Sequence, residues 1–215
     1  MKTFAASLFA AVASAEMMTE TDYKFMSYIS QQGKMYATVE EFLARKDIFK
    51  ATDAHIESVN SNPNSTYTAG HNQFSDMTEA EFSRTLGLRG AEEREVVADV
   101  VDANYPSSWD WRAQGKVTAV KDQGQCGSCW AFSTIEAVES AWMIAGNDEV
   151  IMSEQELVDC STDLNQGCSG GWYFWSYDWL KTNYTMKESD YKYTARDGTC
   201  QYNASKGVTM VSSYG

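Results

Sequence analysis

The chain has 215 residues, of which 43% are hydrophobic and 22% charged, so it can bury a packed core and general disorder is not expected. Its 17 basic and 30 acidic residues give a net charge of −13, which argues against nucleic acid as a partner because phosphate binding needs clustered lysine and arginine. No apolar run in the sequence approaches the roughly 18 to 20 residues of a membrane span.

The first fifteen residues have the pattern of a secretory signal peptide. Lys2 supplies a positive start, residues 4–12 are mostly apolar, and Ala13-Ser14-Ala15 is a small-residue cleavage sequence. The alternative is a short N-terminal helix of the folded domain. We expect residues 1–15 to be removed and the mature chain to follow the secretory pathway. Three acceptor sequons for N-glycosylation become usable there, at Asn64, Asn183 and Asn203.

The cysteines all lie in the second half of the chain, as Cys126, Cys129, Cys160, Cys168 and Cys200. In an oxidising compartment they favour disulfides, and an odd number leaves one thiol over. Four cysteines can pair in three ways, and spacing alone does not choose among these. The first half has no cysteine and must be held by packing, so the asymmetry indicates two units with different roles.

Residues 20–82 are predicted to form a small helical module. Apolar residues recur at near-helical spacing over residues 23–29 and again over residues 42–59, before a break around Pro63. The pattern by itself assigns this module no activity.

Two signals mark the end of the module. Thr78 and Glu81 fit a capping box, which predicts a short helix near Phe82. From Gly87 to about Ala103 the chain is charged and lacks periodicity. This composition predicts an exposed linker that is open to proteases.

The segment at residues 123–132, QGQCGSCWAF, carries the chemistry of the second half, and three interpretations compete. Cys126 and Cys129 could be a redox dithiol, although no strand-helix-strand pattern precedes them. They could be half of a zinc site, although Cys160 and Cys168 are not a second close pair. In the third interpretation one cysteine is a nucleophile and the other belongs to a disulfide.

The residues after Cys129 favour the third interpretation. Apolar side chains on one helical face follow it, namely Trp130, Ile135, Val138 and Trp142. Cys129 would therefore begin a helix that Gly146 can end. The positive end of a helix dipole favours a thiolate, which suits a nucleophile.

The segment from Gln123 to Phe132 resembles the active-site signature of papain-like (cathepsin L-type) cysteine peptidases. Three further stretches are similar to this family: YPSSWDWR at residues 105–112, MSEQELVDC at residues 152–160 and GCSGGW at residues 167–172. Met152 stands where leucine is usual. The resemblance covers nearly everything after the signal peptide.

The first half resembles the family's inhibitory propeptide. One motif follows the spacing of the propeptide's long helix, through Glu41, Arg45, Phe49, Ile56 and Asn60. Thr52 stands where this motif usually has asparagine. A second motif is matched by Gly70, Asn72, Phe74 and Asp76.

The resemblance implies a role for each matching position. Cys129 would attack a peptide carbonyl and form an acyl-enzyme, and Gln123 would donate a hydrogen bond to the oxyanion. The alternative for Gln123 is an ordinary loop amide. Substrate contacts are implied at Gly170, Gly171, Trp172 and Tyr173, although a plain turn and core aromatics are the alternatives. Proline often stands where this chain has Tyr173, so the pocket size stays open.

The resemblance also implies the disulfides and the fold. It pairs Cys126 with Cys168 and Cys160 with Cys200, which leaves Cys129 free. The expected fold is α+β and papain-like, with mainly the helical left lobe present and the β-barrel right lobe mostly missing, after a helical inhibitory prodomain. The implied divisions are a signal peptide at 1–15, a propeptide at 20–82, an activation linker at 83–103 and the start of a peptidase domain at 104–215. An aromatic helix is expected over about residues 172–181; it should be largely buried in the helical lobe, and the alternative is that it lies on a partner.

The second half of the sequence has no histidine that could serve as the general base of a cysteine peptidase. The family places a histidine, held by an asparagine, roughly 130 to 150 residues beyond the nucleophile, but this chain stops at Gly215. Its histidines, His55 and His71, lie in the propeptide-like half and are better interpreted as surface or motif-filling residues than as bases. Residues 208–215 resemble a strand that enters further protein. We therefore expect an incomplete peptidase zymogen; the alternative is a non-catalytic product that inhibits related peptidases.

The mechanism implies neither a metal nor an organic cofactor. The implied partners are peptide or protein substrates, the chain's own propeptide as an inhibitor, and cystatin-type inhibitors. No nucleic acid and no membrane span are expected. A lysosome, a vacuole or the extracellular space is the expected destination, and cleavage preference is not readable from these residues.

Overall fold

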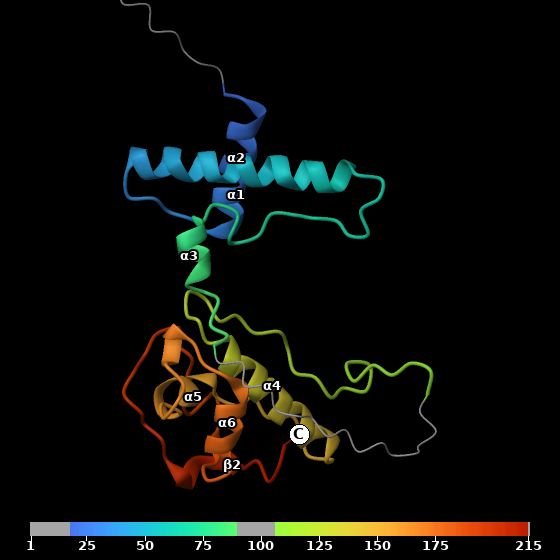
Figure 1. Ribbon diagram of the computed structural model, residues 1–215, viewed down its shortest axis with the longest axis vertical. Helices are drawn as coiled ribbons and strands as arrows, with labels where there is room; N and C mark the ends of the chain where they lie inside the picture. Colours follow the sequence, from blue (N-terminus) through green and yellow to red (C-terminus); the bar gives the residue numbers. More distant parts are fainter. Residues whose placement is uncertain (1–17, 90–105, 215) are drawn as a thin grey trace, which may run out of the picture. The chain divides into compact units, whose positions relative to one another are not determined.

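The computed structural model describes residues 18–89 and 106–214 (Figure 1), which form two compact units, Met1–Thr78 and Glu79–Gly215. The predicted signal peptide at 1–15 and the linker residues 90–103 lie outside the described residues. No helix within the described ranges is long and apolar enough to cross a membrane.

The first unit is built on two helices whose ends follow from local sequence. α1 spans Glu20–Gln32 and begins with a capping box at Thr19. Gly33, at φ 62°, ends it in the left-handed conformation that glycine adopts at little steric cost. α2 spans Val39–Ser61, and the hydroxyl of Thr38 caps its first turn. Both helices fall within the region predicted to be helical.

Aromatic packing forms the core of this unit. Phe25, Tyr28 and Phe49 are buried, and the Phe25 and Phe49 rings lie 5.2 Å apart. Three partly buried side chains surround them, Ile29, Tyr36 and Phe42. The unit therefore has a core of its own, contributed by both helices.

The second unit is mainly helical. Its elements are α3 (Glu79–Ser83), α4 (Cys129–Ile144), α5 (Glu154–Cys160), the 3-10 turn η1 (Gly167–Ser169), α6 (Tyr173–Leu180), β1 (Thr185–Met186), the 3-10 turn η2 (Ala204–Lys206) and β2 (Gly207–Thr209). Helix α4 packs against both α5 and α6 (Figure 1). The two short strands pair antiparallel.

Helix α4 supplies much of this unit's core. Its residues Trp130, Ile135 and Val138 are buried with Leu157 of α5 and Leu180 of α6. The predictions that this helix begins at Cys129 and stops before Gly146 are confirmed, since α4 ends at Ile144 and Gly146 has φ 95°.

Two disulfides connect the second unit. Cys126 is bonded to Cys168 and Cys160 to Cys200, the pairing that the resemblance implies. Cys129 is the free cysteine of the described residues. The dithiol and zinc interpretations of Cys126 and Cys129 are therefore excluded, because Cys126 is already in a disulfide.

The structure differs from the sequence predictions at α6. Its fully buried residues are Ser176 and Leu180, whereas the aromatic side chains at 172–175, 177 and 179 are only half-buried. The small Ser176 lets the helix approach the core, where its hydroxyl contacts Asn165. Tyr177 and Trp179 pack against the core from partly buried positions, whereas the Tyr173 and Phe174 rings pack on one another at 4.7 Å.

Two further predictions need correction. The strand expected over 208–215 stops at Thr209, because the Val211 N–H donates to the Leu180 carbonyl of α6 at 3.1 Å instead of joining a ladder. The exposed linker expected from Gly87 does not begin there. Instead, Gly87 and Arg89 form backbone hydrogen bonds with Gly171.

Candidate active site

Cys129 lies at the start of α4, and its position is fixed by the residue that follows. Trp130 is fully buried, and its indole N–H donates to the Gly167 carbonyl at 3.1 Å. Cys129 itself is half-buried. Ser128 precedes the helix without a side-chain capping bond, and the Cys129 and Trp130 N–H groups have no acceptor among the described residues. These two donors therefore remain available to an anion at this end of the helix.

Gln123 lies in the loop before Cys129, and its side chain is already engaged. The Nε2 group donates to the Cys126 carbonyl at 2.7 Å and to the Thr85 carbonyl at 2.9 Å. The first bond is within the loop and orients the amide. The second bond joins the amide to the segment that follows α3.

Residues 170 and 171 form the wall expected to pair with a peptide, and another part of the chain pairs with it. The Gly171 N–H donates to the Gly87 carbonyl at 2.8 Å, and the Arg89 N–H donates to the Gly171 carbonyl at 2.9 Å. Leu88 thereby forms a parallel bridge with Gly171. Residues 85–89 thus occupy hydrogen-bonding groups of both Gln123 and the glycine wall.

This contact depends on glycine at two positions. A Cβ atom at Gly87 would lie 1.7 Å from the Gly127 carbonyl oxygen. A Cβ atom at Gly127 would lie 2.6 Å from the Cys168 carbonyl oxygen, to which the Gly127 N–H donates at 2.9 Å. The loop before Cys129 is therefore held against η1 by this bond and by the Cys126–Cys168 disulfide.

Asn165 supports the same wall, and the sequence predictions missed it. Its Oδ1 atom accepts from the Trp172 N–H at 2.8 Å, and its Nδ2 group donates to the Ser161 and Ser176 hydroxyls. Trp172 and Tyr173 follow the wall with ring centroids 4.3 Å apart. Both are half-buried, and the Trp172 indole N–H is buried without a partner in the described part of the chain.

A buried ion cluster lies beneath α4 and α5. Lys121 contacts Glu139 at 2.7 Å and Glu154 at 2.5 Å, and both carboxylates are buried. Burial acts to lower the pKa of Lys121, but the hydrogen bonds with the two carboxylates outweigh it, so that the pKa is raised. Thr118 and the Met152 N–H also donate to Glu139. Three donors, from Thr118, Lys121 and the Met152 backbone, thus meet at Glu139, an arrangement that sequence spacing did not reveal.

Both histidines lie in the first unit, one packed on its core and one at the surface. His71 stacks on Phe49 at 4.2 Å, and its Nε2 atom lies 3.2 Å from Asp53. His55 is exposed on α2. Residues 79–215 contain no histidine.

The propeptide motif residues hold the first unit together. Arg45 donates to the Asp76 carbonyl at 3.1 Å, and Asn60 exchanges two hydrogen bonds with the backbone of Ala69. Thr52 donates to the Ser75 carbonyl at 3.0 Å, so this departure from the motif keeps a bond to the second motif. The remaining motif residues lie in the same unit: Glu41, Phe49, Ile56, Gly70, Asn72 and Phe74.

The sequons differ in accessibility. Asn64 and Asn203 are exposed, and the Asn203 Oδ1 atom accepts from the Ser205 N–H at 3.0 Å. Asn183 is half-buried, and its amide donates to the Trp179 carbonyl at 2.9 Å. A glycan on Asn183 would disturb that bond.

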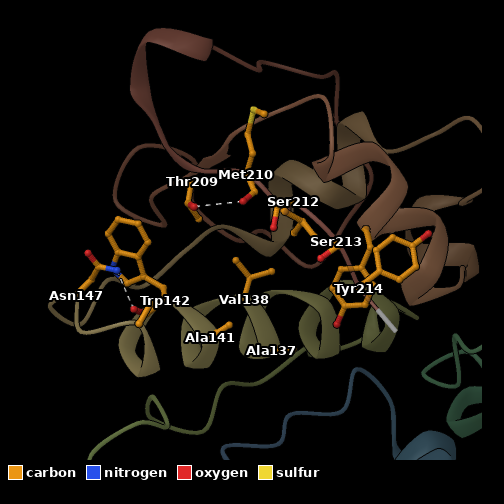
Figure 2. Close-up of a pocket in the computed structure, with 13 residues that line it drawn as sticks. Ala137, Val138, Ala141, Trp142, Asn147, Thr209, Met210, Ser212, Ser213 and Tyr214 are labelled. Atoms are coloured by element: carbon orange, nitrogen blue, oxygen red, sulfur yellow. Dashed lines mark hydrogen bonds between the residues drawn. The ribbon is translucent and has the colours of Figure 1, made fainter. Parts of the chain in front are cut away.

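A pocket of about 520 Å³ lies between α4 and residues 209–214 (Figure 2). Val138, Ala141 and Trp142 line its floor on α4, and Tyr214 lines one end. None of the described residues that line it is charged, and neither Cys129 nor Gln123 is among them. No group of histidine, cysteine or acidic residues within the described ranges is placed to hold a metal.

Comparison with known proteins finds a matching protein family for each half of the chain. Residues 105–215 match the papain family cysteine protease domain, and residues 25–82 match the cathepsin propeptide inhibitor domain (I29). The chain is 41% identical to cysteine protease XCP2 of Arabidopsis thaliana over 86% of this chain and 54% of that protein. It is 40% identical to digestive cysteine proteinase 3 of Homarus americanus over 81% and 57%.

Solved structures are similar as well. Digestive procathepsin L2 from the larval midgut of Tenebrio molitor superposes with a TM-score of 0.81 at 32% identity, covering 88% of this chain and 65% of that one. A recombinant stem bromelain precursor superposes with a TM-score of 0.78 at 34% identity, covering 89% and 63%. The chain spans between half and two thirds of the length of these relatives.

Proposed function

The chain belongs to the papain family of cysteine proteases, and we propose that it is a cysteine-type endopeptidase zymogen with Cys129 as its nucleophile. The Cys129 sulfur would attack a peptide carbonyl, the amine would leave with a proton, and water would hydrolyse the acyl-enzyme. Gln123 and the Cys129 N–H would donate to the oxyanion, where one donor commonly contributes about 3 to 4 kcal/mol.

One observation supports an autoinhibited state: residues 85–89 form hydrogen bonds with the Gln123 side chain and the Gly171 backbone. The Thr85 carbonyl accepts from the Gln123 side chain, and Gly87 and Arg89 use both backbone groups of Gly171. A peptide substrate that needs the Gln123 side chain or the Gly171 N–H and carbonyl must displace this segment first. This competition supports a block that is built into the chain.

The proposal requires a general base from outside residues 79–215, because these residues contain no histidine. The test is to sequence the transcript through the Gly215 codon, express the protein that it encodes, remove its propeptide and assay it on a fluorogenic peptide. We expect activity that is lost in Cys129→Ser. Activity that persists in Cys129→Ser would overturn the assignment of the nucleophile.

The first unit supports a second candidate function, inhibition of a related peptidase in trans. It has its own aromatic core and matches the inhibitor domain. Adding the Cys129→Ser chain to a related peptidase should then slow that enzyme, and Phe49→Ala should weaken the effect. If the transcript stops directly after Gly215, this function takes precedence.

The N-terminal pattern and the family together support passage through the secretory pathway to a lysosome, a vacuole or the extracellular space. Peptide or protein substrates and cystatin-type inhibitors are the proposed partners. Exposure favours Asn64 and Asn203 over Asn183 as glycosylated positions.

A further inference from the structure

Tyr193 joins the two ends of the loop that precedes the proposed nucleophile. Its hydroxyl lies 2.8 Å from the Gln123 carbonyl oxygen and 2.6 Å from the Ser128 hydroxyl. Gln123 carries the proposed oxyanion donor, and Ser128 is the residue before Cys129. One side chain from a distant segment thus contacts both functional ends of the loop.

The direction of these hydrogen bonds follows from the groups involved. A carbonyl oxygen can only accept, so the Tyr193 hydroxyl donates to Gln123. The phenol has a single proton, and the Ser128 hydroxyl must therefore donate to the Tyr193 oxygen. Burial raises the pKa of Tyr193, and the bond from Ser128 acts in the opposite direction, as expected for a donor to the phenol oxygen. The Ser128 hydroxyl thus donates its proton to the hydrogen bond with the Tyr193 oxygen.

Tyr193 is itself fixed from two other sides. Its N–H donates to Glu188 at 2.9 Å, and its ring meets the Phe132 ring edge-on with centroids 4.9 Å apart. Phe132 lies in the first turn of α4, so the phenol is anchored to the same helix that begins with Cys129. The Tyr193 hydroxyl is consequently held in place relative to α4, and the loop that bonds to it is held with it.

From these contacts we infer that Tyr193 is a positioning residue for the active site, an inference that rests on the proposed function. It holds the Gln123 backbone, and with it the side-chain amide, in a fixed relation to the start of α4. It also keeps the Ser128 hydroxyl away from the first turn, where the Cys129 and Trp130 N–H groups have no acceptor among the described residues.

The test compares two tyrosines of one segment in the full 215-residue chain. Tyr193→Phe removes the hydroxyl that contacts the loop. Tyr191→Phe removes a buried hydroxyl that instead bonds to Asp159 at 2.8 Å, so it serves as the matched control. The readout is hydrogen exchange of the Gln123 side-chain amide, measured by NMR.

We expect Tyr193→Phe to accelerate this exchange about tenfold, the order of effect of one lost hydrogen bond, while core amides such as that of Ile135 are unchanged. Tyr191→Phe should leave the Gln123 exchange within about twofold of the unmodified chain. Equal exchange in Tyr193→Phe and the unmodified chain, or equal acceleration by both variants, would overturn the inference.

A second measurement needs no variant. In the unmodified chain the Tyr193 hydroxyl proton should be protected from solvent and show a nuclear Overhauser effect to Ser128; its absence would also overturn the inference. Iodoacetamide labelling tests the proposed function separately. A chain whose Cys129 is never labelled would contradict the nucleophile assignment and leave the Gln123 result untouched.

Discussion

At the residue scale, Asp76 shows how one carboxylate organises the first unit. It is 2% exposed and accepts from Tyr28 at 2.7 Å, Tyr36 at 2.8 Å and Lys34 at 2.9 Å. Burial acts to raise the pKa of Asp76, but the bonds from Lys34 and the two tyrosines outweigh it and lower the pKa below the usual 3.8. A lowered carboxyl pKa contributes stability above about pH 4, and this stability is lost as the pH falls through the lower folded value.

Replacing Asp76 tests this contribution. Asp76→Asn should destabilise the first unit by about 3 kcal/mol at pH 7, because Lys34 loses its buried counter-charge. It should also flatten the loss of stability below pH 4. Urea unfolding followed by far-UV circular dichroism measures both effects. Asp47→Asn, at an exposed position on α2, is the control and should change little; equal losses in the two variants would contradict the account.

The sequence identified Asp76 as a motif residue but not its partners. Lys34, Tyr28 and Tyr36 lie 40 to 48 residues away in the chain. Their contact depends on how the segment after α2 returns to α1 and to the loop between the two helices, which spacing within one motif does not encode. For the same reason Thr85 and Tyr193, which contact Gln123 from distant segments, could not be assigned in advance.

At the scale of elements, α5 carries a buried acid without a charged partner. Glu156 accepts from the Met186 N–H at 2.6 Å, and its other oxygen is buried with no partner in the described part of the chain. Burial raises the pKa of Glu156 from 4.5 to about 7. A raised carboxyl pKa contributes stability that is complete below about pH 4.5 and is lost as the pH rises through 7.

The second unit should therefore unfold at a lower temperature at pH 8 than at pH 5. Glu156→Gln should remove part of this difference, equivalent to at most about 3 kcal/mol, and stabilise the unit at pH 8. Thermal unfolding followed by tryptophan fluorescence measures the change. Glu136→Gln, on the exposed face of α4, is the control. An unchanged pH difference in Glu156→Gln would show that this acid is ionised in the folded chain.

Elements differ in how far the sequence predicts them. Helix α4 has a strong apolar face and a glycine after its end, so both boundaries were predicted. The strands β1 and β2 have two and three residues, too short for an alternating pattern to appear. The prediction for α6 was wrong in degree: aromatic content predicts full burial, but the fully buried residues are Ser176 and Leu180, while Tyr177 and Trp179 pack on the core from partly buried positions.

At the scale of the whole molecule, the chain consists of two units with separate cores. All seven tryptophans lie in the second unit, so their fluorescence reports on that unit alone. Circular dichroism reports on the helices of both units. The two signals can therefore follow the units separately in one sample.

Phe49→Ala should destabilise the first unit by about 3 to 5 kcal/mol, because it removes a fully buried ring. We expect the midpoint of the unfolding transition followed by circular dichroism to fall. The midpoint followed by tryptophan fluorescence should stay unchanged. Ile135→Ala, in the core of the second unit, should move the fluorescence midpoint instead. A fluorescence midpoint that falls equally in both variants would mean that the chain unfolds as one unit.

The family and the general architecture could be predicted from sequence, because the motif around Cys129 and the propeptide motifs are specific. The pairing of residues 87–89 with Gly171 could not, because that segment lacks periodicity and its order comes from backbone contacts. Glycines at 87 and 127 permit this approach without a side-chain signal.

The central claim is that Cys129 is a nucleophile held inactive by residues 85–89, and the most direct measurement is its rate of alkylation by iodoacetamide in the folded chain. Gly87→Ala places a Cβ atom against the Gly127 carbonyl and should displace this segment, whereas Gly70→Ala meets nothing within 4 Å and is the control. We predict that Cys129 alone is labelled, slowly in the unmodified chain and in Gly70→Ala, and at least about tenfold faster in Gly87→Ala, as expected when on the order of 1.4 kcal/mol of protection is lost. Labelling at one rate in all three chains, or labelling of another cysteine, would contradict the account.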